Sequence, residues 1–107
     1  MNNNGTLKSD VLSLLRHGKE NARTGKSLAR TLGFRDDREI RLAIREIIAD
    51  RVPIAASSHG YYIATSPDEA TEYIKVLRSR LVNDAYRRRD FKLAAREILD
   101  PHQMTLL

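Results

Sequence analysis

The chain has 107 residues, which is enough for one small folded domain with a modest core. Its hydrophobic content of 41% predicts a globular rather than a disordered protein, and the absence of cysteine excludes disulfides and thiolate metal sites. The formal net charge is +5 and arginines outnumber lysines 14 to 5, which favours an anionic partner, nucleic acid first. No apolar run approaches the roughly 20 residues of a membrane helix and no signal-peptide core is present, so we expect a cytoplasmic protein.

The charge is unevenly distributed along the chain. Residues 1–34 carry a net charge of +4, residues 35–65 are neutral, and residues 66–107 carry +1. A basic composition can also serve ordinary solubility, so net charge alone does not identify a binding surface. The prediction of a nucleic-acid partner depends on how the charges are sorted over the surface.

The N-terminal part predicts a helix after a short disordered start. Residues 1–6 are Asn-rich with nothing to bury, so we expect them to be disordered. Residues 7–17 form an amphipathic pattern, with one apolar face made of Leu7, Val11, Leu14 and Leu15. Gly18 is placed to end this helix, and the polar residues 19–23 predict a loop.

A second, short helix is predicted over residues 25–32. Thr24 is its N-cap, and Gly33 follows its last turn in the position that favours a left-handed backbone. Phe34 is expected to be buried in the turn that follows. The inward residues of this helix are Leu28, Ala29 and Leu32.

The third predicted helix, residues 36–50, sorts its side chains into faces. Asp36 and Glu39 have the spacing of a capping box. Pro53 disfavours a helical conformation in the residue before it, so the helix should end ahead of that point. At about 100° per residue, the arginines at 38, 41 and 45 share one side, and Leu42 is expected to be partly exposed. The apolar face consists of Ile40, Ala43, Ile44, Ile47 and Ile48.

Residues 53–57 and 61–65 predict two strands of a hairpin. The turn between them, residues 58–60, contains Gly60 where a positive φ is expected. Alternation places Tyr61 and Tyr62 on opposite faces, so one should be buried and the other partly exposed.

Residues 66–100 predict a long helical extension. Ser66, Pro67 and Glu69 combine an N-cap, a first-turn proline and a capping box. The apolar stripe is interrupted at 87–89 and resumes at Phe91, so one helix and two helices with a kink in 83–90 both remain open. Residues 101–107 are expected to be a tail beginning at a helix-ending proline. The stripe consists of Ala70, Tyr73, Ile74, Leu77, Leu81 and Ala85, and then Phe91, Ala94, Ala95, Ile98 and Leu99.

A stripe this long exceeds what one small domain covers. We expect residues 66–100 to form a homodimer interface, and the alternative is that the segment after Arg89 folds back on its own domain.

Three helices followed by a hairpin define the predicted fold class: mainly α (α+β), a winged helix-turn-helix with a long C-terminal helical extension. Residues 7–66 resemble winged helix-turn-helix DNA-binding proteins of the biotin-repressor N-terminal type, and more so small winged-helix proteins of phages and prophages. One departure is Val52, where the family often has Gly before the proline of the first wing strand. The matching residues are Leu28, Ala29, Leu32, Gly33, Arg38, Ile44, Pro53, Ile54, Ser57, Gly60, Tyr61 and Tyr62.

The resemblance implies a non-enzymatic protein that binds double-stranded DNA without a cofactor and controls transcription, or phage replication or excision. Helix 36–50 would enter the major groove, where Arg38, Arg41 and Arg45 would face base edges, since Arg reads guanine through O6 and N7 together. Hairpin 53–65 would be the wing. By position, Thr24, Lys26, Arg30 and Arg35 would contact phosphates, and Ser57, Ser58 and His59 would lie at the wing tip. Each arginine has the alternative of a solvated helix face.

The other motifs in the sequence do not indicate a specific site. Gly25-Lys26-Ser27 lacks the earlier glycine and preceding strand of a phosphate-binding loop, and His17, His59 and His102 lack metal-ligand spacing. The run 87–89 is either a further phosphate contact or a solvated face. No catalytic constellation is visible. The rival function is a winged-helix protein–protein module that binds no DNA.

Overall fold

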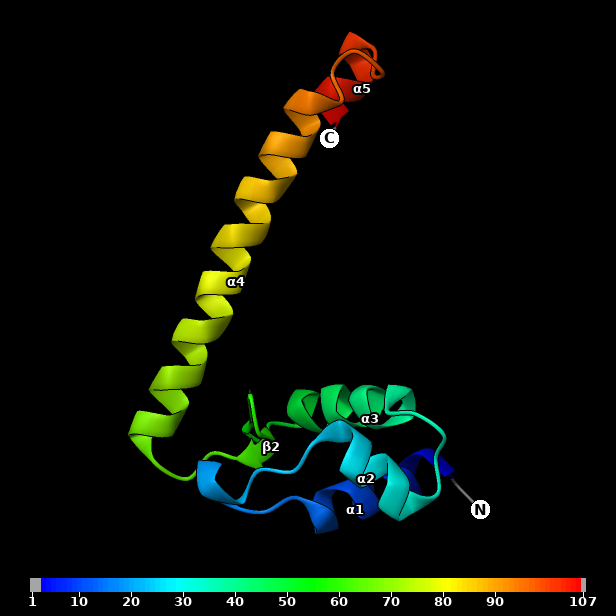
Figure 1. Ribbon diagram of the computed structural model, residues 1–107, viewed down its shortest axis with the longest axis vertical. Helices are drawn as coiled ribbons and strands as arrows, with labels where there is room; N and C mark the ends of the chain where they lie inside the picture. Colours follow the sequence, from blue (N-terminus) through cyan, green and yellow to red (C-terminus); the bar gives the residue numbers. More distant parts are fainter. Residues whose placement is uncertain (1–2, 107) are drawn as a thin grey trace. The chain divides into compact units, whose positions relative to one another are not determined.

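The computed structural model describes the backbone of residues 3–106 and the side chains of residues 7–106. The chain is mainly helical, with one two-stranded antiparallel hairpin and a long C-terminal helix, as the predicted class required (Figure 1). It divides into two compact units, Met1–Tyr73 and Ile74–Leu107. The elements are α1 (Asn3–Leu14), the 3-10 turn η1 (Lys19–Asn21), α2 (Gly25–Leu32), α3 (Arg38–Ala49), β1 (Ile54–Ser57), β2 (Gly60–Ile63), α4 (Pro67–Ala94) and α5 (Pro101–Leu106).

Helix α1 is shifted towards the N-terminus relative to the prediction. It begins at Asn3 rather than residue 7, so residues 3–6 are helical where disorder was expected; residues 1–2 lie outside the described residues. It ends at Leu14 rather than His17, because the following backbone pairs with β2. The Ile63 N–H donates to the Arg16 carbonyl at 2.9 Å, and the Gly18 N–H donates to the Ile63 carbonyl at 3.0 Å.

The predicted bounds and caps of α2 are confirmed. The Thr24 Oγ1 accepts a hydrogen bond from the Ser27 N–H at 3.0 Å. Gly33 has φ 83°, in the left-handed region, and the Phe34 N–H then donates to the Ala29 carbonyl at 2.8 Å. These bonds pair groups that a helix end otherwise leaves unpaired.

Helix α3 begins two residues later than predicted, and the capping box between Asp36 and Glu39 was wrong. Asp36 accepts from the Arg38 N–H at 3.1 Å, and Asp37, the actual N-cap residue, makes no side-chain cap bond. Ile48 was also placed wrongly on the apolar face, since it is exposed, whereas the partial exposure of Leu42 is confirmed.

The core of the first unit lies where α1, α2, α3 and the start of β1 meet. Its largest fully buried aliphatic side chains are Val11, Leu28 and Ile40. Burying each apolar side chain contributes roughly 1.5–3 kcal/mol, so this cluster holds the three helices together. The remaining members are Leu15, Ala29, Ala43, Ile44, Ile47 and Ile54.

The hairpin is one residue shorter at its first end than predicted and shifted at its second strand. Its pairs run from Ile54 with Ile63 to Ser57 with Gly60, so Gly60 belongs to β2. Gly60 has φ 118°, and a Cβ there would lie 2.2 Å from the carbonyl carbon and oxygen of Arg23. The reason is a backbone contact that the local sequence does not reveal: Arg23 and Tyr61 exchange two hydrogen bonds, at 2.9 and 2.7 Å.

The two tyrosines of β2 differ as predicted. Tyr62 is buried and Tyr61 is partly exposed. Burial raises the pKa of the Tyr62 hydroxyl above 10.0, because the charged form is poorly solvated there.

The junction between α3 and the hairpin has an unusual backbone. Arg51 has φ 74°, the one left-handed non-glycine residue among those described. Its N–H donates to the Ile48 carbonyl at 2.9 Å and the Val52 N–H to the Ile47 carbonyl at 3.3 Å, which closes the end of α3. The position that favours glycine in this chain is therefore 51 and not 52.

Helix α4 resolves the choice left open, because it runs unbroken through residues 83–90. The Ser66 Oγ accepts from the Glu69 N–H at 3.1 Å, as a cap should. Within the described residues, no helix is both long and apolar enough to span a bilayer.

The prediction for the C-terminal residues was wrong. Regular helix stops at Ala94 rather than near residue 100, and Pro101 begins α5 instead of starting a tail. Asp100 and Gln103 form a reciprocal capping box, with bonds of 2.8 Å to the Gln103 N–H and 3.0 Å from the Asp100 N–H. Proline fits the first position of a helix because its missing N–H would have no partner there.

Candidate nucleic-acid interface

Helix α3 separates a buried face from an arginine face. Ile40 and Ile44 point into the core, while Arg38, Arg41 and Arg45 are exposed. At about 100° per residue, the arginines lie within roughly 60° of one another and on the side away from the core. In the first unit, α3 packs on α1 and on α2, so the core fixes its orientation (Figure 1).

The three arginines, which we call the α3 arginine stripe, are not equivalent. The Arg41 Nε lies 3.5 Å from the Asp37 Oδ1, which forms an ion pair between residues one helical turn apart. Such exposed pairs contribute at most about 1 kcal/mol, so Arg41 remains available to an anion. Of the stripe, only Arg41 forms an ion pair within residues 7–106.

Asp37 also lies where the starts of α2 and α3 approach β2. A Cβ on Gly25, the first residue of α2, would lie 2.9 Å from the Asp37 Oδ2 and 3.4 Å from the Tyr61 ring. Burial raises the pKa of the Tyr61 hydroxyl, and the negative charge of Asp37 raises it further. Asp37 thus pairs with Arg41 and lies close to the start of α2 and to Tyr61 of β2.

A second basic group borders a hollow of about 450 Å³ beside the turn between α2 and α3. Lys26 and Arg30 reach it from α2, and Arg35 from the turn. Asp36 and Asp37 line the same hollow and reduce its net charge. The structure therefore brings together three of the four predicted phosphate contacts, with carboxylates among them.

Thr24, the fourth predicted phosphate contact, has a structural task. Its hydroxyl oxygen accepts the N-cap bond of α2. The residue is exposed at the start of α2, but the sequence pattern for a cap already accounts for its presence.

The tip of the hairpin is organised by Ser57. Its Oγ accepts from the His59 N–H at 3.2 Å and donates to the Gly60 carbonyl at 3.4 Å. Ser58 and His59 are exposed at the turn. Of the three predicted tip residues, Ser57 shapes the turn and the other two are free to contact a partner.

Sequence reasoning missed Arg23, which borders the exposed face of α2. Its guanidinium donates to the Ser27 Oγ at 3.0 Å and to the Thr31 Oγ1 at 2.8 Å. Ser27 and Thr31 are one turn apart, so the side chain lies along α2. The signal was the row of hydroxyls at Ser27 and Thr31, four and eight residues after an arginine.

Within the first unit, a separate polar cluster joins the start of α4 to η1 and to the residue before the helix cap. Glu69 accepts from the backbone N–H groups of Thr65 at 3.0 Å and of Lys19 at 2.8 Å. These bonds hold the pKa of the Glu69 carboxyl below its ordinary value of 4.5. The Lys19 ammonium donates to Glu72 at 2.8 Å, which raises the pKa of Lys19.

Comparisons with protein-family models, with curated proteins and with solved structures gave no match.

Proposed function

We propose that this chain is a non-enzymatic winged helix-turn-helix protein that binds double-stranded DNA. Helix α3 would enter the major groove, and the β1–β2 hairpin would be the wing beside the adjacent backbone. Its role would be transcriptional control, or control of replication or excision as in the phage proteins that the sequence resembles.

The observation that carries this proposal is the α3 arginine stripe, which lies opposite a buried face that fixes the helix. A rigid helix with forked donors on its outer side suits the major groove, because guanidinium groups meet guanine O6 and N7 together. Lys26, Arg30 and Arg35, around one hollow at the preceding turn, suit phosphates, which set register without reading sequence.

We further propose that the protein acts as a homodimer through residues 66–100. The exposed apolar side chains of α4 support this, since the helix buries none of its residues within its own chain. A symmetric dimer favours an inverted repeat with half-sites one or more helical turns apart.

The second candidate is a protein–protein module that uses the same face of α3. Leu42 and Ile48 favour it, because two exposed aliphatic side chains next to the arginine stripe suit a protein surface. Leu42 also suits the methyl group of thymine, so its exposure alone does not decide between the partners.

The test is fluorescence anisotropy on labelled duplex DNA over a salt series, with the double variant Arg41→Glu/Arg45→Glu. We expect log affinity of the wild type to fall linearly with log salt. We expect the variant to bind at least about 30-fold more weakly. Random-sequence duplexes serve first, and selected sequences follow.

The matched control is Lys75→Glu/Arg96→Glu, which changes the net charge equally in the second unit. Circular dichroism and the association state should match the wild type for both variants. Equal loss of binding in both variants would mean that only net charge matters. No wild-type binding at low salt would replace DNA with a protein partner for this face.

A further inference from the structure

One set of residues in the second unit follows the alternating spacing of a coiled coil, and this spacing is continuous only when two charged residues are counted with the apolar ones. Alternating steps of three and four residues define one seam, in which Asp84 and Arg88 stand between two apolar groups. We call this set the α4 seam. Its members within α4 are Ile74, Leu77, Leu81, Asp84, Arg88 and Phe91, and the spacing continues past the helix end at Ala94 through the buried Ala95 and the exposed Ile98.

The apolar members of the α4 seam within α4 have no cover. Leu81 and Phe91 are 71% and 73% exposed, and Ile74 is 64% exposed. Large apolar side chains exposed at heptad spacing indicate a helical partner, since each would otherwise remain in water.

The α4 seam is symmetric about position 86. If a second copy lies antiparallel across it, Asp84 faces Arg88 of the other copy, and Leu81 faces Phe91. The same spacing continues with Leu77 opposite Ala95 and Ile74 opposite Ile98, but Ala95 and Ile98 lie beyond the end of α4 at Ala94, and Ala95 is buried within its own chain. Every apolar position meets an apolar one, and each Asp84 meets one Arg88, so the dimer contains two such contacts, one on either side of the symmetry axis.

The charges decide the direction of the second copy. In a parallel pair, Asp84 would face Asp84 and Arg88 would face Arg88, so two like-charge contacts would lie in the centre of the interface. In the antiparallel pair, both contacts are attractive. A buried charge without an opposite charge beside it is strongly unfavourable, so the antiparallel pair is strongly preferred over the parallel pair.

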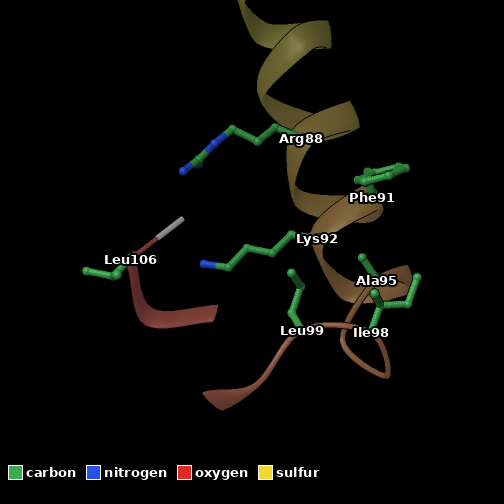
Figure 2. Close-up of a pocket in the computed structure, with 7 residues that line it drawn as sticks. All are labelled: Arg88, Phe91, Lys92, Ala95, Ile98, Leu99 and Leu106. Atoms are coloured by element: carbon green, nitrogen blue, oxygen red, sulfur yellow. The ribbon is translucent and has the colours of Figure 1, made fainter. Parts of the chain in front are cut away.

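The structure also provides a place for the partner's apolar residues. A hollow of about 560 Å³ is lined by four consecutive positions of this spacing: Arg88, Phe91, Ala95 and Ile98. Figure 2 shows the residues around it, with Arg88 and Lys92 extending from the same side of α4; Leu99 and Leu106 complete the lining. The antiparallel pairing faces these four positions with Asp84, Leu81, Leu77 and Ile74 of the second copy.

We infer that the occupant of this face is a second copy of the chain, joined through an antiparallel coiled coil centred on residue 86 with two Asp84–Arg88 ion pairs in its middle. This specifies the dimer in the proposed function, but it needs no DNA. Its tests are made without DNA, so failure here and failure of DNA binding are distinguishable.

The first test is the association state by analytical ultracentrifugation. We expect a wild-type dimer and a dissociation constant at least about 100-fold weaker for Asp84→Arg, which places two arginines in each central contact. The double variant Asp84→Arg/Arg88→Asp restores both contacts and should dimerise again. A monomeric wild type, or a single variant that dimerises like the wild type, would overturn the inference.

A matched pair locates the interface on α4. Leu81→Asp, in the seam, should dissociate the dimer, whereas Val82→Asp, one residue further on and about 100° around the helix, should leave it intact. Circular dichroism monitors helix content in both. Equal dissociation by the two variants, or none by Leu81→Asp, would count against the seam.

Cysteine cross-linking fixes the direction, because the chain has no cysteine of its own. A mixture of Leu81→Cys and Phe91→Cys chains should form a heterodisulfide under mild oxidation. Leu81→Cys alone should cross-link poorly. The reverse result, efficient coupling of position 81 to itself, would establish a parallel dimer and overturn the antiparallel one.

Discussion

The two units use apolar residues in opposite ways. In the first unit, α3 repeats apolar residues along one face and buries them, with Ile40 fully buried. In the second unit, α4 also repeats apolar residues at three- and four-residue steps, but it leaves Leu81 and Phe91 mostly exposed. The same periodicity therefore predicts a helix in both units, but it does not tell whether the face is covered from within the chain or from outside it.

The difference lies in the connections. The first unit returns on itself within short distances: α1, α2 and α3 follow one another closely, and the segment from Arg16 to Arg23 pairs with β2. The second unit contains α4 from Ile74 onward and the short α5. A long helix with one short companion must leave most of its stripe for another molecule or for water.

The largest effect is expected when one aliphatic side chain is truncated in each unit and the two losses of stability are compared. Ile40→Ala should lower the free energy of unfolding of the first unit by about 2–5 kcal/mol, because it leaves a cavity in a closed core. Leu93→Ala, on the exposed outer side of α4, should change stability by no more than about 0.5 kcal/mol. Urea denaturation followed by circular dichroism measures both. A large cost for Leu93→Ala would reveal a core in the second unit.

The next largest effect should come from the close contact between Gly60 of β2 and the backbone of Arg23. Gly60→Ala should cost about 2 kcal/mol or more, since the new methyl group meets the Arg23 backbone and φ is positive. Gly33→Ala is the matched control. Its φ is also positive, but nothing lies within 4 Å of the added atom, so only about 1 kcal/mol of backbone strain is expected. Equal costs would mean that the close approach at Gly60 contributes nothing.

Sequence alone predicted what is local. The bounds of α2 follow from Thr24 and Gly33, and the buried face of α3 follows from its period. The pairing of residues 16–23 with β2 was missed because it joins segments about 40 residues apart and leaves no periodic trace. Helix α5 was missed although Asp100 and Gln103 have capping-box spacing, because a proline can either end a helix or occupy its first position, and Pro101 follows a long helical pattern.

The candidate site was predicted in its residue types but not in its pairings. The arginine face of α3 follows from the helical period. The double use of Asp37, towards Arg41 and towards Gly25, depends on the packing of α2 on α3. The role of Ser57 in the hairpin turn likewise depends on the two-residue loop that Gly60 permits.

A smaller effect is expected where α3 passes into the hairpin. Arg51→Gly should raise the free energy of unfolding by about 0.5 kcal/mol, because relief of the left-handed strain is partly offset by the greater freedom of glycine in the unfolded chain. Arg51→Ala keeps the strain and should be nearly neutral. Melting temperatures measure the difference, and a destabilised Arg51→Gly would indicate that the arginine side chain makes a stabilising contact.

The smallest effect should be the pH dependence contributed by Glu69, which fastens the start of α4. Its folded pKa is lowered, so its stabilisation is present above about pH 4.5 and is lost as the pH falls through that lowered pKa. Glu69→Gln should therefore lower the melting temperature more at pH 6 than at pH 3. The control is Glu72→Gln, which loses only the contact with the exposed Lys19 side chain. A Glu69→Gln effect that is the same at both pH values would contradict the assignment.

The length of α4 has a consequence for spacing if two chains join as inferred. Pro67 lies 19 residues before the symmetry centre at 86, and at 1.5 Å per residue this is about 28 Å of helix on either side. The points where the two first units attach are thus separated by roughly 57 Å, more than the 34–36 Å of one DNA turn. Inserting or deleting helical residues ahead of residue 74 would therefore lengthen or shorten the distance between these two attachment points.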